Sequence, residues 1–206
     1  MTMNVQAQNL TPQTGISNAV DISTTIWIAG TEYGQPTGDL GNIDAMVGDS
    51  FSYQTNWAIT GSSLGSGNTI REGDYFTKVL FTVPNLNLSS AQNQKLQING
   101  IVIGEWSLVY NPTTGEMTYT VIFNRYAGYF LASTVEGLIR GNGQFNGQKE
   151  GGDITVNEAT GTITIEPRPT PDPTPSVPGG TGWRPQTPPT FNNNAYPFGK
   201  GVKWHN

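Results

Sequence analysis

Residues 51–59, with the sequence FSYQTNWAI, contain the pattern that decides the fold class of this chain. Every second side chain of this stretch is large and mostly apolar, namely Phe51, Tyr53, Thr55, Trp57 and Ile59. The side chains between them are small or polar, as on a surface that faces solvent. A period of two with aromatic residues on one face predicts a half-buried β-strand.

Four later stretches repeat the β pattern. Residues 74–84 predict a strand in which the odd-numbered side chains from Tyr75 to Val83 share a face, and Pro84 ends it. Residues 95–104 predict a hairpin around Asn99-Gly100. Two more hairpins are predicted, at 105–123 with a turn at 111–115 and at 153–167 with a turn near 159–161. Together these patterns predict about nine short strands in an antiparallel sandwich or barrel, because parallel sheets need long crossover helices.

The counts of single residue types exclude several classes of chemistry. The 206 residues include no cysteine and one histidine, the penultimate residue His205. Disulfides, thiol catalysis and thiolate metal sites are therefore excluded. A Ser-His-Asp triad would depend on that terminal histidine, and no pair of carboxylates stands in a recognisable glycosidase arrangement. We expect a protein that is not an enzyme.

Charge and hydropathy narrow the range of partners. The chain has 15 acidic and 10 basic residues, a net charge of −5. Since phosphate binding requires a dense basic patch, we expect no nucleic-acid partner. No apolar run reaches about 18 residues, so we expect no membrane insertion. The first residues lack the basic and apolar regions of a signal peptide, so either the protein does not use that export route or the sequence is a mature fragment.

The composition changes near Pro167 and predicts three parts. Up to residue 166 the chain has 14 acidic residues, six basic residues and four prolines, whereas the rest has one acidic residue, four basic residues and ten prolines. Alternate prolines after residue 166 are typical of an extended polyproline spacer. We predict a polar N-terminal arm at 1–19, a β-sandwich domain at 20–166 and a proline-rich tail at 167–206.

Three segments together resemble the adhesive immunoglobulin-like domains of Gram-positive cell-surface adhesins, the family that binds collagen and fibrinogen. Residues 68–88, NTIREGDYFTKVLFTVPNLNL, resemble the family's Ile-x-x-Gly-Asp-x-Phe entry into a long strand ended by proline. Residues 108–130 are similar to the family's hairpin with a Thr-Tyr-Thr strand. Residues 161–175 are similar to its last strand, which runs into a proline-rich stretch.

This resemblance implies an all-β, immunoglobulin-like antiparallel β-sandwich with a proline-rich C-terminal tail. It also implies an extracellular place on a bacterial cell surface and a host extracellular protein or glycan as the partner. Two features depart from the family. Many members join a lysine of an early strand to a later Asn or Asp by an isopeptide bond, and residues 20–30 contain no lysine. The fibrinogen binders use a cleft between two tandem domains, and only one such domain fits in this chain.

Asn124, Arg125, Tyr126 and Tyr129 are the candidate ligand-binding residues. They follow the predicted strand at 118–123, and exposed tyrosine and arginine side chains dominate binding hot spots. Tyrosine rings also stack on sugar rings and on the prolines of collagen. The alternative is that Tyr126 and Tyr129 pack in the core or across strands.

Two glycine-rich stretches predict loops. Residues 34–50 carry Asp39, Asp44 and Asp49, whose hard oxygen ligands suit Ca²⁺. Their spacing matches no EF-hand, and such stretches are usually plain turns. The second stretch is GNGQFNG at 141–147. Its glycine spacing departs from the dinucleotide-binding motif and no helix pattern follows, so we expect a surface loop.

Five aromatic side chains lie in the predicted tail, where no core is expected: Trp183, Phe191, Tyr196, Phe198 and Trp204. Large aromatic residues in a polar segment predict a docking surface. The tail is basic and the body is acidic, so we expect the tail to dock on a β surface of its own body or of a neighbouring copy.

Three functions remain open at this point. The first is a non-enzymatic surface adhesin domain that attaches to a host protein or glycan. The second is a structural subunit of a phage virion decoration or filament, whose arm or tail docks on neighbouring copies by adding a strand to an open sheet. The third is a carbohydrate-binding module.

Overall fold

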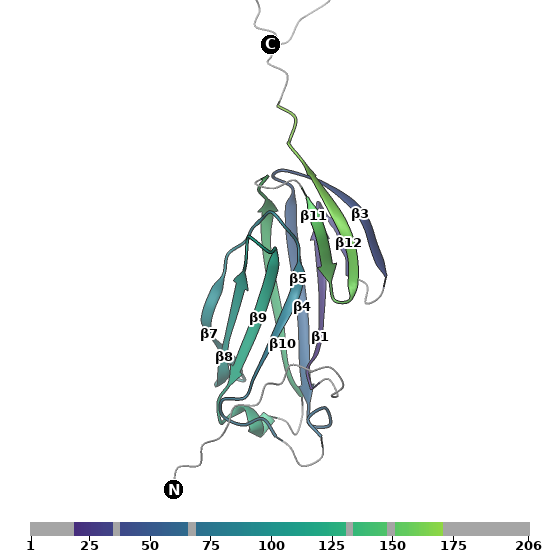
Figure 1. Cartoon of the computed structure of the whole chain (residues 1–206). Coiled ribbons are helices and arrows are strands. Elements are labelled where there is room, and N and C mark those ends of the chain that lie inside the picture. The colour runs from purple at the N-terminus through teal and green to yellow at the C-terminus, as the bar shows by residue number, and fades with distance from the viewer. Residues whose placement is uncertain (1–18, 35–37, 66–68, 131–133, 148–150, 171–206) are drawn as a thin grey trace, which may run out of the picture. The chain divides into compact units, whose positions relative to one another are not determined.

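The computed structural model describes residues 19–34, 38–65, 69–130, 134–147 and 151–170. The chain divides into two compact units, and the first ends at Arg168. The described residues of this unit form two β-sheets in a sandwich-like arrangement, with one short 3-10 helix, η1, at Ala127–Phe130 (Figure 1). The all-β prediction is confirmed at this level.

The first sheet has five antiparallel strands in the order β2-β1-β4-β10-β6. Their bounds are β1 Asp21–Ile28, β2 Thr31–Tyr33, β4 Ser50–Thr60, β6 Leu86–Asn87 and β10 Thr134–Phe145. The central strand β4 contains residues 51–59, and every odd-numbered side chain of that stretch is buried. The period of two in the sequence therefore places β4 as expected, with its large side chains against the second sheet.

The second sheet has seven strands in the order β3-β12-β11-β5-β9-β8-β7. Their bounds are β3 Asp39–Met46, β5 Tyr75–Thr82, β7 Ala91–Ile98, β8 Ile101–Tyr110, β9 Glu116–Phe123, β11 Gly152–Val156 and β12 Ala159–Glu166. Strands β9, β8 and β7 lie side by side in Figure 1. The hairpins expected at 95–104 and 105–123 are confirmed by the antiparallel pairs β7–β8 and β8–β9.

One edge of the seven-stranded sheet differs from the predicted antiparallel arrangement. Strands β3 and β12 pair in parallel, with Ile43 opposite Ile163. Hairpin patterns predict the direction of strands that follow each other along the chain. Strands β3 and β12 are separated by most of the domain, so no local turn determines their relative direction, and the purely antiparallel prediction is wrong here.

Three local predictions are also wrong. The last hairpin turns at Asn157-Glu158, because Asn157 takes a φ of 54° and the buried Ala159 already belongs to β12. Residues 141–147 do not form a loop, because β10 continues to Phe145. In β5 the odd-numbered side chains do not share one face, because a register shift between Val79 and Phe81 lets Leu80 and Phe81 both be buried.

Aromatic side chains dominate the core between the sheets. The rings of Phe51 and Phe81 lie 5.2 Å apart between centroids, and those of Trp57 and Phe76 also lie 5.2 Å apart. Rings at these separations attract one another in addition to burying apolar area. These ring contacts join β4 of the first sheet to β5 of the second.

Candidate functional site

The turn after β9 carries an exposed cluster that we call the tyrosine patch, made of Arg125, Tyr126 and Tyr129. The side chain of Tyr126 is 42% exposed and that of Tyr129 is 79% exposed. Their ring centroids lie 6.4 Å apart with 33° between the planes. The guanidinium carbon of Arg125 lies 5.2 Å from the centroid of the Tyr126 ring. The alternative that both tyrosines pack in the core is therefore wrong.

Asn124 positions this turn through its side chain. Its Nδ2 donates a hydrogen bond to the carbonyl oxygen of Val102 (2.8 Å), and its Oδ1 accepts one from the backbone N–H of Tyr126 (2.9 Å). Its backbone N–H donates to the carbonyl oxygen of Ile103 (2.8 Å). Because both ends of the amide are used inside the protein, the structure assigns Asn124 to holding the patch.

The backbone of the 3-10 helix η1, which carries Tyr129, is packed against neighbouring segments. Ala127 is fully buried, and the backbone N–H of Tyr129 donates to the carbonyl oxygen of Tyr126 (3.2 Å). A Cβ atom on Gly128 would lie 2.7 Å from the carbonyl oxygen of Ile70, so only glycine fits against that segment. The backbone beneath the rings is therefore packed on its neighbours although the rings themselves face solvent.

The patch combines two kinds of recognition chemistry. Tyrosine rings offer apolar faces and a polar hydroxyl at low conformational cost. A guanidinium group offers a planar set of donors for carboxylate, sulfate or carbonyl oxygens. Arg125 already lies near one ring, so a ligand that covers the patch meets an aromatic surface and a cation together.

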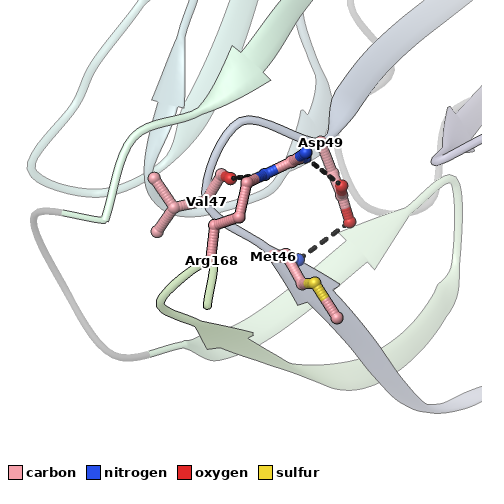
Figure 2. A network of polar contacts seen from close by, with 4 residues as sticks. All are labelled: Met46, Val47, Asp49 and Arg168. Carbon is pink, nitrogen blue, oxygen red and sulfur yellow. Dashed lines mark hydrogen bonds and ion pairs between the residues drawn. The ribbon is translucent and has the colours of Figure 1, made fainter. Parts of the chain in front are cut away.

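The three aspartates proposed for Ca²⁺ do not form a site. Asp39 and Asp44 belong to β3 and not to a loop. Figure 2 shows Asp49 accepting hydrogen bonds from the backbone N–H of Met46 (2.9 Å) and from a guanidinium nitrogen of Arg168 (3.1 Å). Within the described ranges no group of three or more His, Cys, Asp or Glu side chains is placed to hold a metal ion. Asp49 instead helps to hold the chain after β12, where Arg168 also donates to the carbonyl oxygen of Val47.

The predicted tail-docking residues, Trp183, Phe191, Tyr196, Phe198 and Trp204, lie outside the described residues. Sequence reasoning missed a shallow depression of about 460 Å³ on the outer face of the five-stranded sheet. Its floor is formed by the small side chains of Ser23, Asn56 and Ala58, and Leu138 stands beside them with 53% of its side chain exposed. The sequence feature that could have indicated this depression is the set of small or polar side chains at the even-numbered positions of residues 51–59.

Buried tyrosines stand apart from the patch. Burial raises the pKa of Tyr53 to about 12. Burial also raises the pKa values of Tyr110 and Tyr119. A hydrogen bond with the Leu86 backbone lowers the pKa of Tyr110 by a smaller amount, and one with the Trp57 side chain does the same for Tyr119. These shifts arise from loss of solvent around the phenolate form. They mark a tightly packed core rather than a reactive site.

No protein-family model matches this chain, and no curated protein matches it. Among the described residues, no helix is both long and apolar enough to cross a membrane.

Proposed function

We propose that this chain is a non-enzymatic attachment domain with an immunoglobulin-like β-sandwich, carried on the outside of a bacterial cell. Its partner is a host extracellular protein or glycan, and the tyrosine patch is the surface that binds it. The sequence resemblance of residues 68–88 and 108–130 to surface adhesins supports this proposal. Those segments form β5 and most of the β8–β9 hairpin, and the hairpin leads directly into the patch.

One observation carries the proposal. Tyr126 and Tyr129 are exposed large aromatic side chains on a backbone that is packed and hydrogen-bonded. Exposed rings that cluster on one surface mark interaction sites. A fixed backbone lowers the entropy that a ligand must remove on binding. Arg125 adds directional donors beside the rings, which favours a ligand with oxygen acceptors.

The test uses the full chain on an array of glycans and extracellular matrix proteins. Replacing both Tyr126 and Tyr129 by Ala is expected to weaken binding to the retained ligand by about 30-fold or more, the effect of losing a hot spot of about 2 kcal/mol. The matched control is the pair Val79→Ala and Val109→Ala. These side chains are 42% and 40% exposed on strands β5 and β8 of the seven-stranded sheet, and their loss is expected to leave binding unchanged. Unchanged binding by the tyrosine variant would contradict the proposal.

A second candidate function is favoured by a different surface. Val79, Thr118 and Val109 are paired across β5, β9 and β8, and Ile122, four residues further along β9, is 43% exposed. The exposed side chains of Val79, Val109 and Ile122 suit contact between copies in a virion decoration or filament, with the virion as the location. Sedimentation of the full chain and of the Val79→Ala/Val109→Ala control separates the two functions, since only a subunit that self-assembles loses its large species in the control. A carbohydrate-binding module would retain sugars alone on the array.

A further inference from the structure

A groove of about 710 Å³ is lined by residues of both sheets. Strands β7, β8 and β9 contribute from the seven-stranded sheet, and β4 and β10 contribute from the five-stranded sheet. Strand β7 is the last strand of its sheet, and within the described chain β6 pairs with β10 only at Gln144 and Phe145. The volume of the groove falls in the range of about 300–1,000 Å³ that is usual for small-ligand sites.

Aromatic side chains of the seven-stranded sheet line one side of the groove. Trp106 of β8 is partly buried and Tyr119 of β9 is fully buried, and their ring centroids lie 6.1 Å apart. Leu96 of β7 also lines the groove. Because an aromatic ring has a negative face, it attracts the C–H bonds on the apolar face of a sugar ring. This side of the groove is therefore suited to a saccharide.

Polar side chains of both sheets complete the lining. Lys95 and Gln97 of β7 and Glu136 and Arg140 of β10 are all exposed. Together they offer ammonium and guanidinium donors, a carboxylate acceptor and an amide that both donates and accepts. The hydroxyl groups of a saccharide also donate and accept hydrogen bonds, so they can use each of these groups.

The two basic side chains of the groove keep free hydrogen-bonding capacity. Nε of Arg140 donates to Oε1 of Gln54 (2.9 Å), which orients the guanidinium group. Its two terminal amino groups bond to no other residue in the described ranges. Lys95 is opposite Glu105 in the β7–β8 pair, but among the described residues their charged groups form no ion pair. Both cations can therefore contact a ligand directly.

The charge of the groove is opposite to that of the domain around it. Up to residue 166 the chain has 14 acidic and six basic residues. The lining of the groove has two basic residues and one acidic residue, Glu136. Cations that gather in one groove attract an anionic group of a ligand. A guanidinium group binds a carboxylate through two parallel hydrogen bonds.

We propose that this groove binds an oligosaccharide that carries carboxylate groups. A carboxylate of the ligand pairs with Arg140 and Lys95, and a sugar ring packs against Trp106. Gln97 and Glu136 bind the sugar hydroxyls. This site is separate from the tyrosine patch and does not depend on what the patch binds.

The test is isothermal titration of the full chain with tetragalacturonate and with its methyl ester, which has the same sugar rings without the charge. The unchanged chain is expected to bind the acid with a Kd below about 1 mM. It is expected to bind the ester at least about tenfold more weakly, because a charge-assisted hydrogen bond is lost. Arg140→Gln is expected to weaken binding of the acid by a similar factor. The matched control is Arg71→Gln, at an exposed arginine outside the groove, which is expected to leave the Kd unchanged.

Nuclear magnetic resonance locates the bound sugar. The indole N–H signal of Trp106 is expected to shift on titration with tetragalacturonate. The same shift and the same Kd are expected in the Tyr126→Ala/Tyr129→Ala variant, so failure of this site and failure of the tyrosine patch are distinguishable. Loss of binding in that variant overturns the proposal, because the sugar then lies on the patch.

Three other results overturn the proposal. The first is a Kd for the acid above about 1 mM in the unchanged chain. The second is an equal Kd for acid and ester, or an equal effect of Arg140→Gln and Arg71→Gln. The third is an oligoglutamate peptide that binds as tightly as tetragalacturonate, because the groove then recognises charge and not a sugar.

Discussion

At the scale of single residues, the glycines of β10 decide how closely aromatic rings lie against that strand. Gly137 is paired with Trp57, and a methyl group at Gly137 would collide with the indole ring. In a packed core, added volume forces side chains from their rotamers and shifts the backbone. We expect Gly137→Ala to lower the free energy of unfolding by about 1–3 kcal/mol in a chemical denaturation experiment.

The neighbouring position provides the control for this prediction. Leu138 points to the other face of β10 and is 53% exposed. Leu138→Ala is therefore expected to change the free energy of unfolding by no more than about 0.5 kcal/mol. If Gly137→Ala unfolded at the same denaturant concentration as Leu138→Ala, the close contact between ring and strand would be refuted.

At the scale of elements, Asn157 joins the β11–β12 turn to the other sheet. Its Oδ1 accepts a hydrogen bond from the backbone N–H of Thr24 (2.8 Å), and its Nδ2 donates to the carbonyl oxygens of Thr24 (2.8 Å) and Gly34 (3.1 Å). Strand β2 pairs with β1 only at residues 26–28, so the amide of Asn157 takes the place of a strand beside Thr24. We expect Asn157→Ala to lower the free energy of unfolding by about 2–3 kcal/mol, measured by thermal or chemical denaturation.

Two further variants separate the stability that comes from the hydrogen bonds of Asn157 from the stability that comes from the backbone conformation of a turn asparagine. Asn157→Gly keeps easy access to a positive φ but removes the amide, so most of the loss should persist. Asn99 also takes a positive φ, 51°, in the β7–β8 turn, and Asn99→Ala tests the conformational part alone, at about 1 kcal/mol. A loss for Asn157→Gly near zero would show that the amide does not join the two sheets.

At the scale of the whole molecule, the buried tyrosines predict unfolding at alkaline pH. Burial raises the pKa of Tyr53 from 10.0 to about 12 and raises the pKa of Tyr110 and Tyr119 in the same direction. The unfolded chain thus releases these protons at a lower pH than the folded chain does. The free energy of unfolding is therefore expected to be highest below pH 10 and to fall as the pH rises from about 10 to about 12.

Denaturation midpoints measured across this pH window check the prediction. Tyr53→Phe removes one of the titrating groups and is expected to reduce the slope. Tyr129→Phe is the matched control, since Tyr129 is 79% exposed and its hydroxyl is solvated in both states. A stability that stays constant up to pH 12 would contradict the burial of ionisable tyrosines in the core.

Periodicity could predict the strands because alternation is a local property of a half-buried sheet. It identified the buried face of β4 and two hairpins, and it placed the candidate tyrosines directly after β9. It could not predict that Tyr126 and Tyr129 are exposed, because an aromatic residue after a strand packs or projects according to the turn beneath it. That turn depends on Asn124 and Gly128, whose partners Val102 and Ile70 are distant in sequence.

The sequence by itself determined that this chain is built of strands with an aromatic core, because side-chain alternation and turn residues act over a few neighbouring positions. Only the tertiary structure decided the parallel pairing of β3 with β12 and the continuation of β10 through its glycines. These features depend on contacts between residues that lie far apart along the chain. Such contacts form only when the two sheets pack together, so no local sequence pattern predicts them.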